Sequence, residues 1–509
     1  MSKSRLMLKG SALQTVEALV AIAVGFITLP LMQNSLGGEL YGVWILIGGF
    51  AALLYIFDFG FASSIIQSVS SSVAVKDHKR TNTVINTALL IYAILSLVIL
   101  VAVCFVAVLY KPNITHVVSQ NELSWVIFIV GLSIAIEFPF KALAGLPQAY
   151  LRFDKGASYR ILVKIIAFVG IVILLHYEFK LIAIALWSLA MSVFSNILFL
   201  SLAREVFQEL KISSSYVDIK FVKPLFAYSA WSFLIDVNSL VKGRIDLFFI
   251  AGYVSLTAVS IYYVPVRLVE YTLQLLFKAL NLGMPILTAN ASHSNSEKFD
   301  ENLLILNRIN VYFSTLTFLF FLMFGKTIIY YWMGTEFNYQ EAYQILLILM
   351  GGRLASLASN GYVTALYAKA LHRRFAYSNI AETILTSILL YATLVVYNMG
   401  VLGAAISVAL PIFFSRIIFV PILTLKTIGV KDAPRMLFLS YRPALLLTLV
   451  VPLFLILPPP VALGLNHLIL VASSMMVLSV FMYLDIRPNE LNLLKTLAPK
   501  IMTGKKTNV

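Results

Sequence analysis

The 509-residue chain is 60% hydrophobic and only 12% charged, with a mean hydropathy of +0.91. Because soluble domains carry roughly 25% charged residues, this composition excludes an ordinary soluble protein. The net charge of +15 comes from cations gathered in alternate loops, which is the pattern of a membrane protein and argues against a nucleic-acid partner.

Apolar stretches long enough to cross a bilayer follow one another along the whole chain. Their continuous runs of about 20 residues predict an all-α membrane protein, since the strands of a membrane barrel alternate over about 10 residues. The first stretch lacks a small-residue cleavage site, so we interpret it as a span and not as a signal peptide. The fourteen expected spans are residues 10–34, 40–71, 83–110, 124–149, 157–176, 180–203, 222–250, 256–288, 303–325, 340–369, 376–397, 400–425, 443–461 and 465–484.

The lysines and arginines at the ends of these spans predict an orientation. One set of ends is rich in both residue types, whereas the opposite set holds only Lys111, Lys180 and Lys326. Cytoplasmic loops carry the excess of positive charge, so both termini are expected in the cytoplasm.

The chain is expected to divide into three parts. Residues 1–215 would form an N-terminal lobe of six spans, residues 216–430 a C-terminal lobe of six, and residues 431–509 two further spans with an amphipathic tail on the cytoplasmic surface. The pairs Ser11-Ala12 and Ser229-Ala230 recur at an offset of about 218 residues, which is weak support for a parallel repeat. Transporters commonly place their substrate path at such a repeat interface.

Charged side chains lie inside the expected spans, where they are costly unless they face protein or water. Glu137 and Lys141 have the i,i+4 spacing of a local ion pair, and Arg244 has Asp246 as a neighbour. Deeper in the spans lie Glu17, Asp58, Glu137, Lys141, Asp236, Lys242, Arg244, Asp246, Arg267, Glu270, Lys278 and Arg353, whereas Glu382 and Arg416 lie nearer the cytoplasmic ends and are interpreted as anchors.

The cations of the second half favour an anionic ligand. Arg267 and Arg353 fall near mid-depth, and arginine binds phosphate oxygens in a bidentate manner. We therefore predict a pyrophosphate site formed by Arg267 and Arg353 with Lys278 and Arg244. The alternative is a structural network of ion pairs, with Lys278 extended toward the cytoplasmic interface.

The carboxylates at depth are candidates for coupling transport to H⁺ or Na⁺. Burial raises the pKa of a carboxyl group and lets it take up and release a proton, which makes Asp58, Glu17, Asp236 and Glu270 the predicted coupling or cavity carboxylates. A carboxylate that is locked to an arginine would not titrate usefully.

Signatures of enzymes and cofactors are missing from the sequence. It has no P-loop and no cluster of cysteine and histidine, so we expect neither an internal ATPase, nor a metal site, nor a cofactor. The single Cys104 lies inside the third expected span and is interpreted as a small buried apolar residue.

Four segments of the chain carry a pattern of glycine, aromatic and charged residues. The first is Leu36-Gly-Gly-Glu-Leu-Tyr-Gly-Val-Trp-Ile-Leu-Ile-Gly-Gly, followed by Asp58-Phe-Gly-Phe. The others are Gly145-Leu-Pro-Gln-Ala-Tyr-Leu-Arg-Phe-Asp, Asp246-Leu-Phe-Phe-Ile-Ala-Gly and Ile261-Tyr-Tyr-Val-Pro-Val-Arg. In their order and spacing they resemble bacterial polysaccharide flippases of the Wzx type, which belong to the multidrug/oligosaccharidyl-lipid/polysaccharide (MOP) exporter superfamily. The resemblance extends to about residue 425.

The resemblance implies two six-helix lobes in a V around a central cavity, plus two C-terminal spans. It implies a flippase of the bacterial inner membrane that moves an undecaprenyl-pyrophosphate-linked oligosaccharide, such as a repeat unit of O-antigen lipopolysaccharide, capsule or exopolysaccharide, to the periplasmic leaflet by alternating access. The partners that it implies are membrane lipids, a polysaccharide polymerase and a chain-length regulator, and we expect a monomer.

Three other functions are weighed against this one. An ion-coupled multidrug exporter of the same superfamily would need an acidic cavity and few arginines at mid-membrane. A membrane-embedded enzyme of polysaccharide synthesis would need a sizeable outer loop with catalytic residues, and the outer loops are short. A channel would need a filter-like loop, which the sequence lacks.

Overall fold

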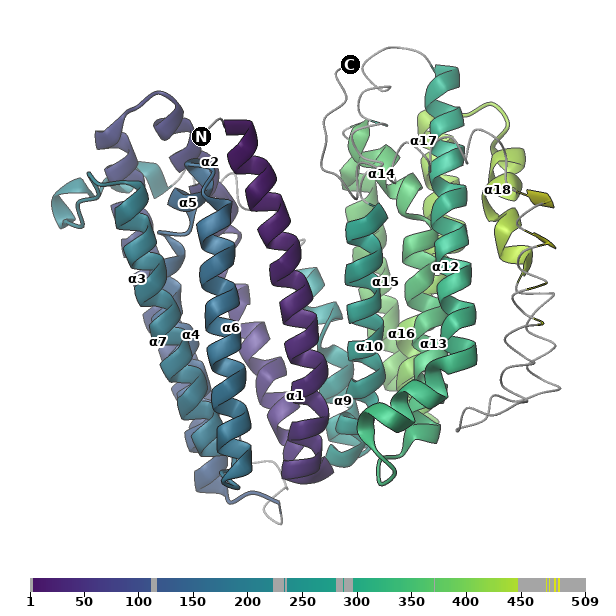
Figure 1. The fold of residues 1–509 in the computed structure, drawn as a ribbon, viewed down its shortest axis with the longest axis horizontal. Helices are drawn as coiled ribbons and strands as arrows, with labels where there is room; N and C mark the ends of the chain where they lie inside the picture. The colour runs from purple at the N-terminus through teal and green to yellow at the C-terminus, as the bar shows by residue number, and fades with distance from the viewer. Residues whose placement is uncertain are drawn as a thin grey trace. The chain divides into compact units, whose positions relative to one another are not determined.

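The computed structural model describes residues 3–110, 117–222, 236–280, 296–369 and 371–446, together with single residues at 233, 287, 473, 476, 480, 481, 484 and 485. Every element within these residues is helical, and nine of the helices there are long and apolar enough to cross a membrane (Figure 1). The prediction of an all-α membrane protein is confirmed. Most of the expected thirteenth and fourteenth spans and the whole amphipathic tail lie outside the described residues.

The chain forms two compact units, residues 1–248 and 249–509. Whether it divides at residues 215 and 430 stays a prediction. The elements of the first unit are α1 (Lys3–Leu54), η1 (Tyr55–Asp58), α2 (Phe61–Ala74), α3 (His78–Leu109), α4 (Gln120–Lys141), α5 (Gly145–Ala149), α6 (Phe153–His176), α7 (Leu181–Val206), η2 (Ser214–Tyr216), η3 (Ile219–Phe221) and the first residues of α9 (Ile245–Tyr253).

The elements of the second unit follow from the remainder of α9. They are α10 (Leu256–Leu280), α12 (Ser296–Met333), α13 (Tyr339–Ala358), α14 (Asn360–Ala368), α15 (His372–Tyr391), η4 (Ala392–Val396), α16 (Gly400–Phe414), η5 (Ser415–Phe419), α17 (Val420–Ile428), α18 (Ala433–Tyr441) and η6 (Arg442–Leu445). Both η4 and η5 are π-helical turns. Such turns often mark functional positions within a helix.

The second expected span is not one continuous helix. Its first part belongs to α1, in which Gly37 interrupts the helical backbone with a φ of 79°. The chain then passes through η1 and the two left-handed residues Phe59 and Gly60 before α2 begins. Left-handed backbone is costly for a bulky residue such as phenylalanine, so the surrounding packing must hold this break in place.

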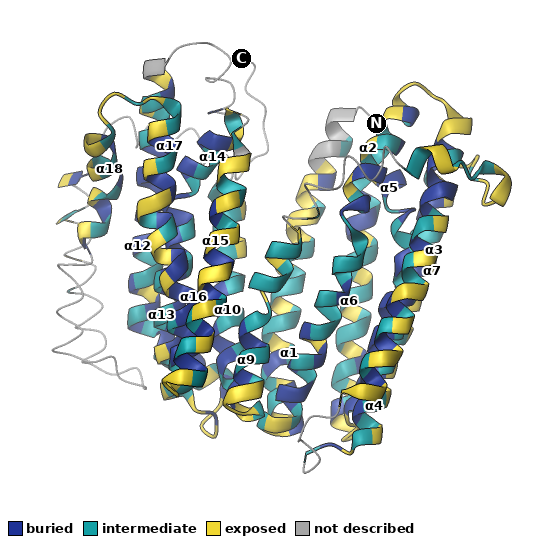
Figure 2. Cartoon of the chain, turned by 180° about the vertical axis from the view of Figure 1, so that it is seen from behind, coloured by how far each residue is buried: buried dark blue, intermediate teal, exposed yellow. Residues whose placement is uncertain are grey.

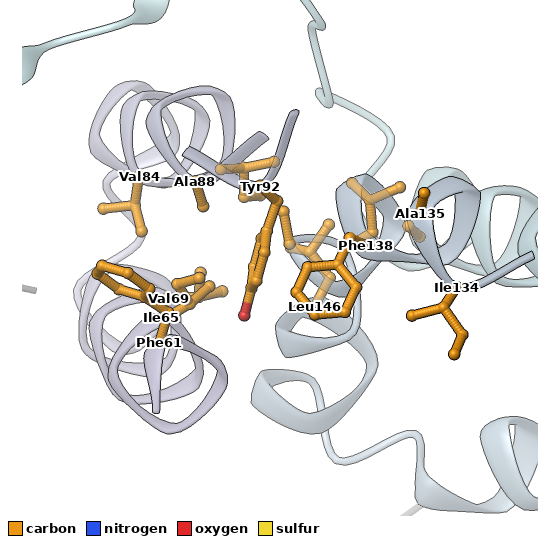
Figure 3. Close-up of a cluster of buried hydrophobic side chains, with 14 of the residues drawn as sticks. Phe61, Ile65, Val69, Val84, Ala88, Tyr92, Ile134, Ala135, Phe138 and Leu146 are labelled. Carbon is orange, nitrogen blue, oxygen red and sulfur yellow. The ribbon is translucent and has the colours of Figure 1, made fainter. Parts of the chain in front are cut away.

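The break is held by a core in which α2, α3, α4 and α5 meet. Figure 3 shows Phe61 and Ile65 of α2 facing Val84 of α3, and Tyr92 beside Phe138 of α4. All five side chains are almost fully buried. This apolar cluster fixes the start of α2 and thereby positions the residues of the break.

The outer faces of the helices remain apolar although they are exposed. On α3 the side chains of Leu97, Val101 and Phe105 are exposed, and Figure 2 shows exposed positions along α3 and α7. Large exposed apolar faces are normal where a helix contacts lipid. Cys104 lies on this exposed face, so the prediction that it is buried is wrong.

Helices α13 and α16 approach each other closely at Gly352. A Cβ atom at Gly352 would lie 2.6 Å from the backbone of Ala409, whereas one at the adjacent Gly351 would meet only Phe318 at 3.9 Å. We expect Gly352→Ala to lower the free energy of unfolding in detergent by about 1–3 kcal/mol, because the backbones must move apart. The matched variant Gly351→Ala should leave the free energy of unfolding unchanged or raise it slightly. Equal effects of the two variants would contradict this packing.

Candidate functional site

Asp58 lies at the break in the second expected span. It ends η1, and its Oδ1 atom accepts a hydrogen bond of 3.2 Å from the backbone amide of Ala62 in the first turn of α2. The hydroxyl of Tyr92 also donates to Oδ1, at 2.9 Å. The carboxylate therefore caps α2 and connects it to α3.

Lys141 of α4 is the ion-pair partner of Asp58. Its Nζ atom lies 2.7 Å from Asp58 Oδ2, and the two side chains are 18% and 17% exposed. The expected local pair between Glu137 and Lys141 is replaced by this longer-range one, and Glu137 instead accepts a hydrogen bond of 2.8 Å from the hydroxyl of Tyr55. The ammonium group also lies 4.5 Å from the ring centre of Tyr55, which adds a cation–π contact.

Removing the charge of Asp58 should destabilise the first unit. We expect Asp58→Asn to lower the free energy of unfolding by about 2–3 kcal/mol, because Lys141 would be left charged and largely buried. Tyr92→Phe removes only one hydrogen bond and should cost about 1 kcal/mol. Denaturant unfolding in detergent measures both. The account fails if Asp58→Asn costs no more than Tyr92→Phe, or if adding Lys141→Met restores none of the loss.

Asp236 and Arg244 belong to the seventh expected span. Asp236 is exposed and lies near enough to Asp58 and Lys141 for their charges to act on it. In the described residues no side chain forms an ion pair or a hydrogen bond with Asp236. Arg244 is half-buried and follows Gly243 at a break before α9, while Asp246 is buried and accepts a hydrogen bond from the amide of Leu247.

Glu17 is held by two cations of α6. Both of its carboxylate oxygens accept hydrogen bonds of 3.0 Å from Arg160 Nε, and Lys164 Nζ lies 3.1 Å from Oε1. The sequence analysis considered neither Arg160 nor Lys164 as a site residue. Their i,i+4 spacing places both on one face of α6, and this is the signal that could have identified them.

In the second unit, α10 carries Arg267, Glu270 and Lys278. Arg267 Nη1 lies 2.8 Å from Glu270 Oε2, one turn further along the helix. Its Nη2 atom donates to the hydroxyl of Tyr263, whose ring also lies beneath the guanidinium group. Lys278 is exposed in the last turn of α10. Arg267 and Glu270 thus balance each other's charge.

Arg353 of α13 differs from the other arginines of the spans. It is half-buried, and the described part of the chain offers it no hydrogen bond or ion pair. Its charge acts on Arg416 of the π-helical turn η5. Arg416 is buried and already paired with Glu382 of α15 at 3.0 Å. Glu382 is paired with Arg416 and not with Arg353, so the charge of Arg353 has no counter-ion among the described residues.

The structure thus sorts the eight predicted site residues by their partners. Asp58, Glu17 and Glu270 are each paired with a cation, and Arg267 is paired with Glu270. Asp236, Arg244 and Arg353 form no ion pair among the described residues. Lys278 is exposed in the last turn of α10. Sequence reasoning missed Tyr55, Tyr92, Arg160 and Lys164 as members of these clusters.

Comparison with known proteins identifies relatives of the chain. The model of a family described as "Polysaccharide biosynthesis protein" matches residues 7–281. No curated protein matches the sequence. The fold is similar to that of the lipid II flippase MurJ in an inward closed conformation, with a TM-score of 0.65, 14% identity and coverage of 92% of this chain and 98% of that one.

Two further solved structures share the fold. An inward-facing multidrug resistance MATE family transporter of the MOP superfamily has a TM-score of 0.62 at 12% identity, covering 83% of this chain and 98% of that one. A MOP superfamily transporter from Pyrococcus furiosus, described as having a binding pocket of reverse polarity, has a TM-score of 0.55 at 14% identity, covering 84% and 94%. At these identities the similarity shows the fold alone.

Proposed function

This chain belongs to the polysaccharide biosynthesis protein family, and from that premise we propose that it is the flippase for an undecaprenyl-pyrophosphate-linked oligosaccharide. It is a multi-pass membrane transporter with the MATE and MurJ fold, and not an enzyme. The cargo would be a repeat unit of O-antigen, capsule or exopolysaccharide. It would pass from the cytoplasmic to the periplasmic leaflet of the bacterial inner membrane by alternating access, in a monomer whose termini are cytoplasmic.

The observation that supports this substrate is that Arg353 has no counter-ion in the part of the chain that the structure describes. An unpaired charge within a membrane span is costly and normally marks a functional position that faces protein or water. A pyrophosphate group would supply the missing negative charge and accept bidentate hydrogen bonds from the guanidinium group. We assign Arg353 as the principal pyrophosphate ligand of the second unit.

Arg267, Lys278 and Arg244 are assigned supporting roles. Arg267 could contact a pyrophosphate only by exchanging Glu270 for it, because the two side chains are paired. Lys278 in the second unit and Arg244 in the first each add positive charge, which would raise the local concentration of an anionic substrate. A polymerase and a chain-length regulator are proposed partners in the membrane.

Asp236 supports a second candidate function, ion-coupled export of small cationic compounds. It carries negative charge in an expected span without a partner among the described residues, as a coupling site for H⁺ or Na⁺ would require. Asp58, Glu17 and Glu270 are already paired, so coupling would depend on Asp236. The same ion could equally drive the flippase.

Lipid translocation in proteoliposomes tests the flippase proposal. The purified protein would receive a pyrophosphate-linked glycolipid in one leaflet, or an uncharged glycolipid with the same tail and sugar. A membrane-impermeant reagent would then detect lipid that has crossed. The proposal predicts rapid movement of the pyrophosphate lipid alone. Equal movement of both lipids would show scrambling, and no movement of either would contradict the proposal.

A further inference from the structure

The first unit contains two neighbouring cations, Arg160 and Lys164 of α6, that belong to none of the sites predicted from the sequence. We propose that Arg160 and Lys164 form a binding site for a phosphate or pyrophosphate group, and that Glu17 occupies this site as an internal counter-ion until the ligand displaces it. This inference rests on the proposed function only in one respect, namely that a lipid carries the phosphate group.

The contacts of Glu17 imitate those of a bound phosphate. Arg160 reaches both carboxylate oxygens from Nε and approaches Oε2 from Nη2 at 2.9 Å, while Lys164 contacts Oε1. Arginine and lysine combine in this manner to hold phosphates, since the guanidinium group binds two oxygens and the ammonium group adds a point charge. The cations are therefore already arranged around an oxyanion.

The charges of the cluster do not balance. One carboxylate faces two cations, so the group carries one net positive charge. Glu17 is only 15% exposed, whereas Arg160 and Lys164 are 40% and 36% exposed. The carboxylate thus lies on the buried side of the cluster and the cations present open surface. An incoming anion would therefore approach the cations from the side opposite Glu17.

The cluster lies within candidate membrane spans and not in a loop. Arg160 lies about 10 Å along α6 from its first residue, Phe153, and Lys164 lies a further turn inside. Glu17 lies about 12 Å along α1 from Lys9, where its candidate span begins. Cations within a span normally face water or protein and not lipid. A third helix, α7, contributes the ring of Phe199, whose centre lies 6.0 Å from Arg160 Cζ in a cation–π contact with the guanidinium group.

Exchange of one anion for another makes the site selective for charge. A neutral ligand cannot displace Glu17, because both cations would lose their counter-ion without replacement. A phosphate or pyrophosphate carries at least as much charge as the carboxylate and offers more acceptor oxygens. Glu17 therefore competes with the ligand and limits its affinity, which would allow the ligand to leave again during transport.

Anion binding by full-length protein variants tests this site. The protein would be placed in nanodiscs of phosphatidylcholine and titrated calorimetrically with inorganic pyrophosphate and with geranyl pyrophosphate. We expect Glu17→Gln to bind about tenfold more tightly, because one competing charge is removed next to the ligand. The triple variant Glu17→Gln/Arg160→Gln/Lys164→Gln, which leaves no unpaired charge to disturb folding, should lose binding at least tenfold.

The matched control is Glu205→Gln, which frees Lys155 at the end of the same helix from its ion pair. It should bind both anions as wild type does. If Glu17→Gln binds only geranyl pyrophosphate more tightly, the ligand is a phosphate carried by a lipid. If it binds both probes more tightly, the site accepts a free phosphate as well as a lipid-borne one. Unchanged affinity in Glu17→Gln, or equal gains in Glu17→Gln and Glu205→Gln, would overturn the site. Translocation by the wild type would leave the proposed function intact in that case.

Discussion

Replacing Asp485 by alanine is expected to lower the free energy of unfolding by about 3–5 kcal/mol, the largest stability loss that we predict. Asp485 Oδ2 lies 2.8 Å from Arg308 of α12, and Oδ1 lies 2.7 Å from Arg442 of η6. The side chains of Arg308 and Asp485 are only 1% and 2% exposed. Without the carboxylate, the buried charge of Arg308 would lose this counter-ion, and the hydroxyl of Tyr312 would lose this acceptor.

Chemical unfolding in detergent, followed by tryptophan fluorescence, measures this loss. The control is Asp432→Ala, which removes the exposed cap of α18 and should cost about 1 kcal/mol. The double variant Arg308→Met/Asp485→Leu should recover part of the stability, because it removes both buried charges together. If Asp485→Ala is no less stable than Asp432→Ala, the ion pair does not hold residue 485 against α12.

Replacing Arg353 by glutamine should slow translocation of a pyrophosphate-linked glycolipid about 10- to 100-fold, because a hydrogen bond to a charged group contributes about 1.5–3 kcal/mol. Arg353→Lys should retain part of the rate, since lysine keeps the charge but loses the bidentate geometry. Stability should change little or rise, because no described carboxylate loses a partner. The initial rate in proteoliposomes, at matched protein content, measures the effect.

Arg374→Gln is the control for a general loss of positive charge. Arg374 is exposed and donates to the hydroxyl of Thr427 at 2.6 Å, so its removal should leave the rate unchanged. A rate in Arg353→Gln equal to that in Arg374→Gln would show that Arg353 is not a substrate ligand. It would leave the family membership untouched and move the pyrophosphate site elsewhere.

The helical spans could be predicted because their signal is local. Apolar runs of sufficient length identified the membrane-spanning helices that the structure describes, as in α3, α4 and α16. The break at Phe59 and Gly60 could not be predicted from hydropathy, because neither residue is charged or strongly polar and the apolar run continues beyond them. Tertiary packing of α2 against α3 and α4 determines it.

The pairing of the charged residues could be predicted only in part. The i,i+3 pair of Arg267 and Glu270 lies within one helix and follows from their spacing. The same local rule failed for Lys141, whose partner Asp58 lies 83 residues away. Glu17 and Arg160 are 143 residues apart. No pattern along the chain encodes such distant contacts, so the distinction between paired and unpaired charges required the structure.

The central claim, that the protein carries a pyrophosphate-linked glycolipid across the bilayer, is tested most directly by measuring two activities in the same vesicles. Purified protein would be reconstituted with the glycolipid in one leaflet and a fluorescent organic cation in the lumen. Lipid movement that depends on the protein, is lost in Arg353→Gln and is accompanied by no cation efflux is the predicted result. Ion-driven efflux of the organic cation without lipid movement would contradict the claim and identify a drug exporter.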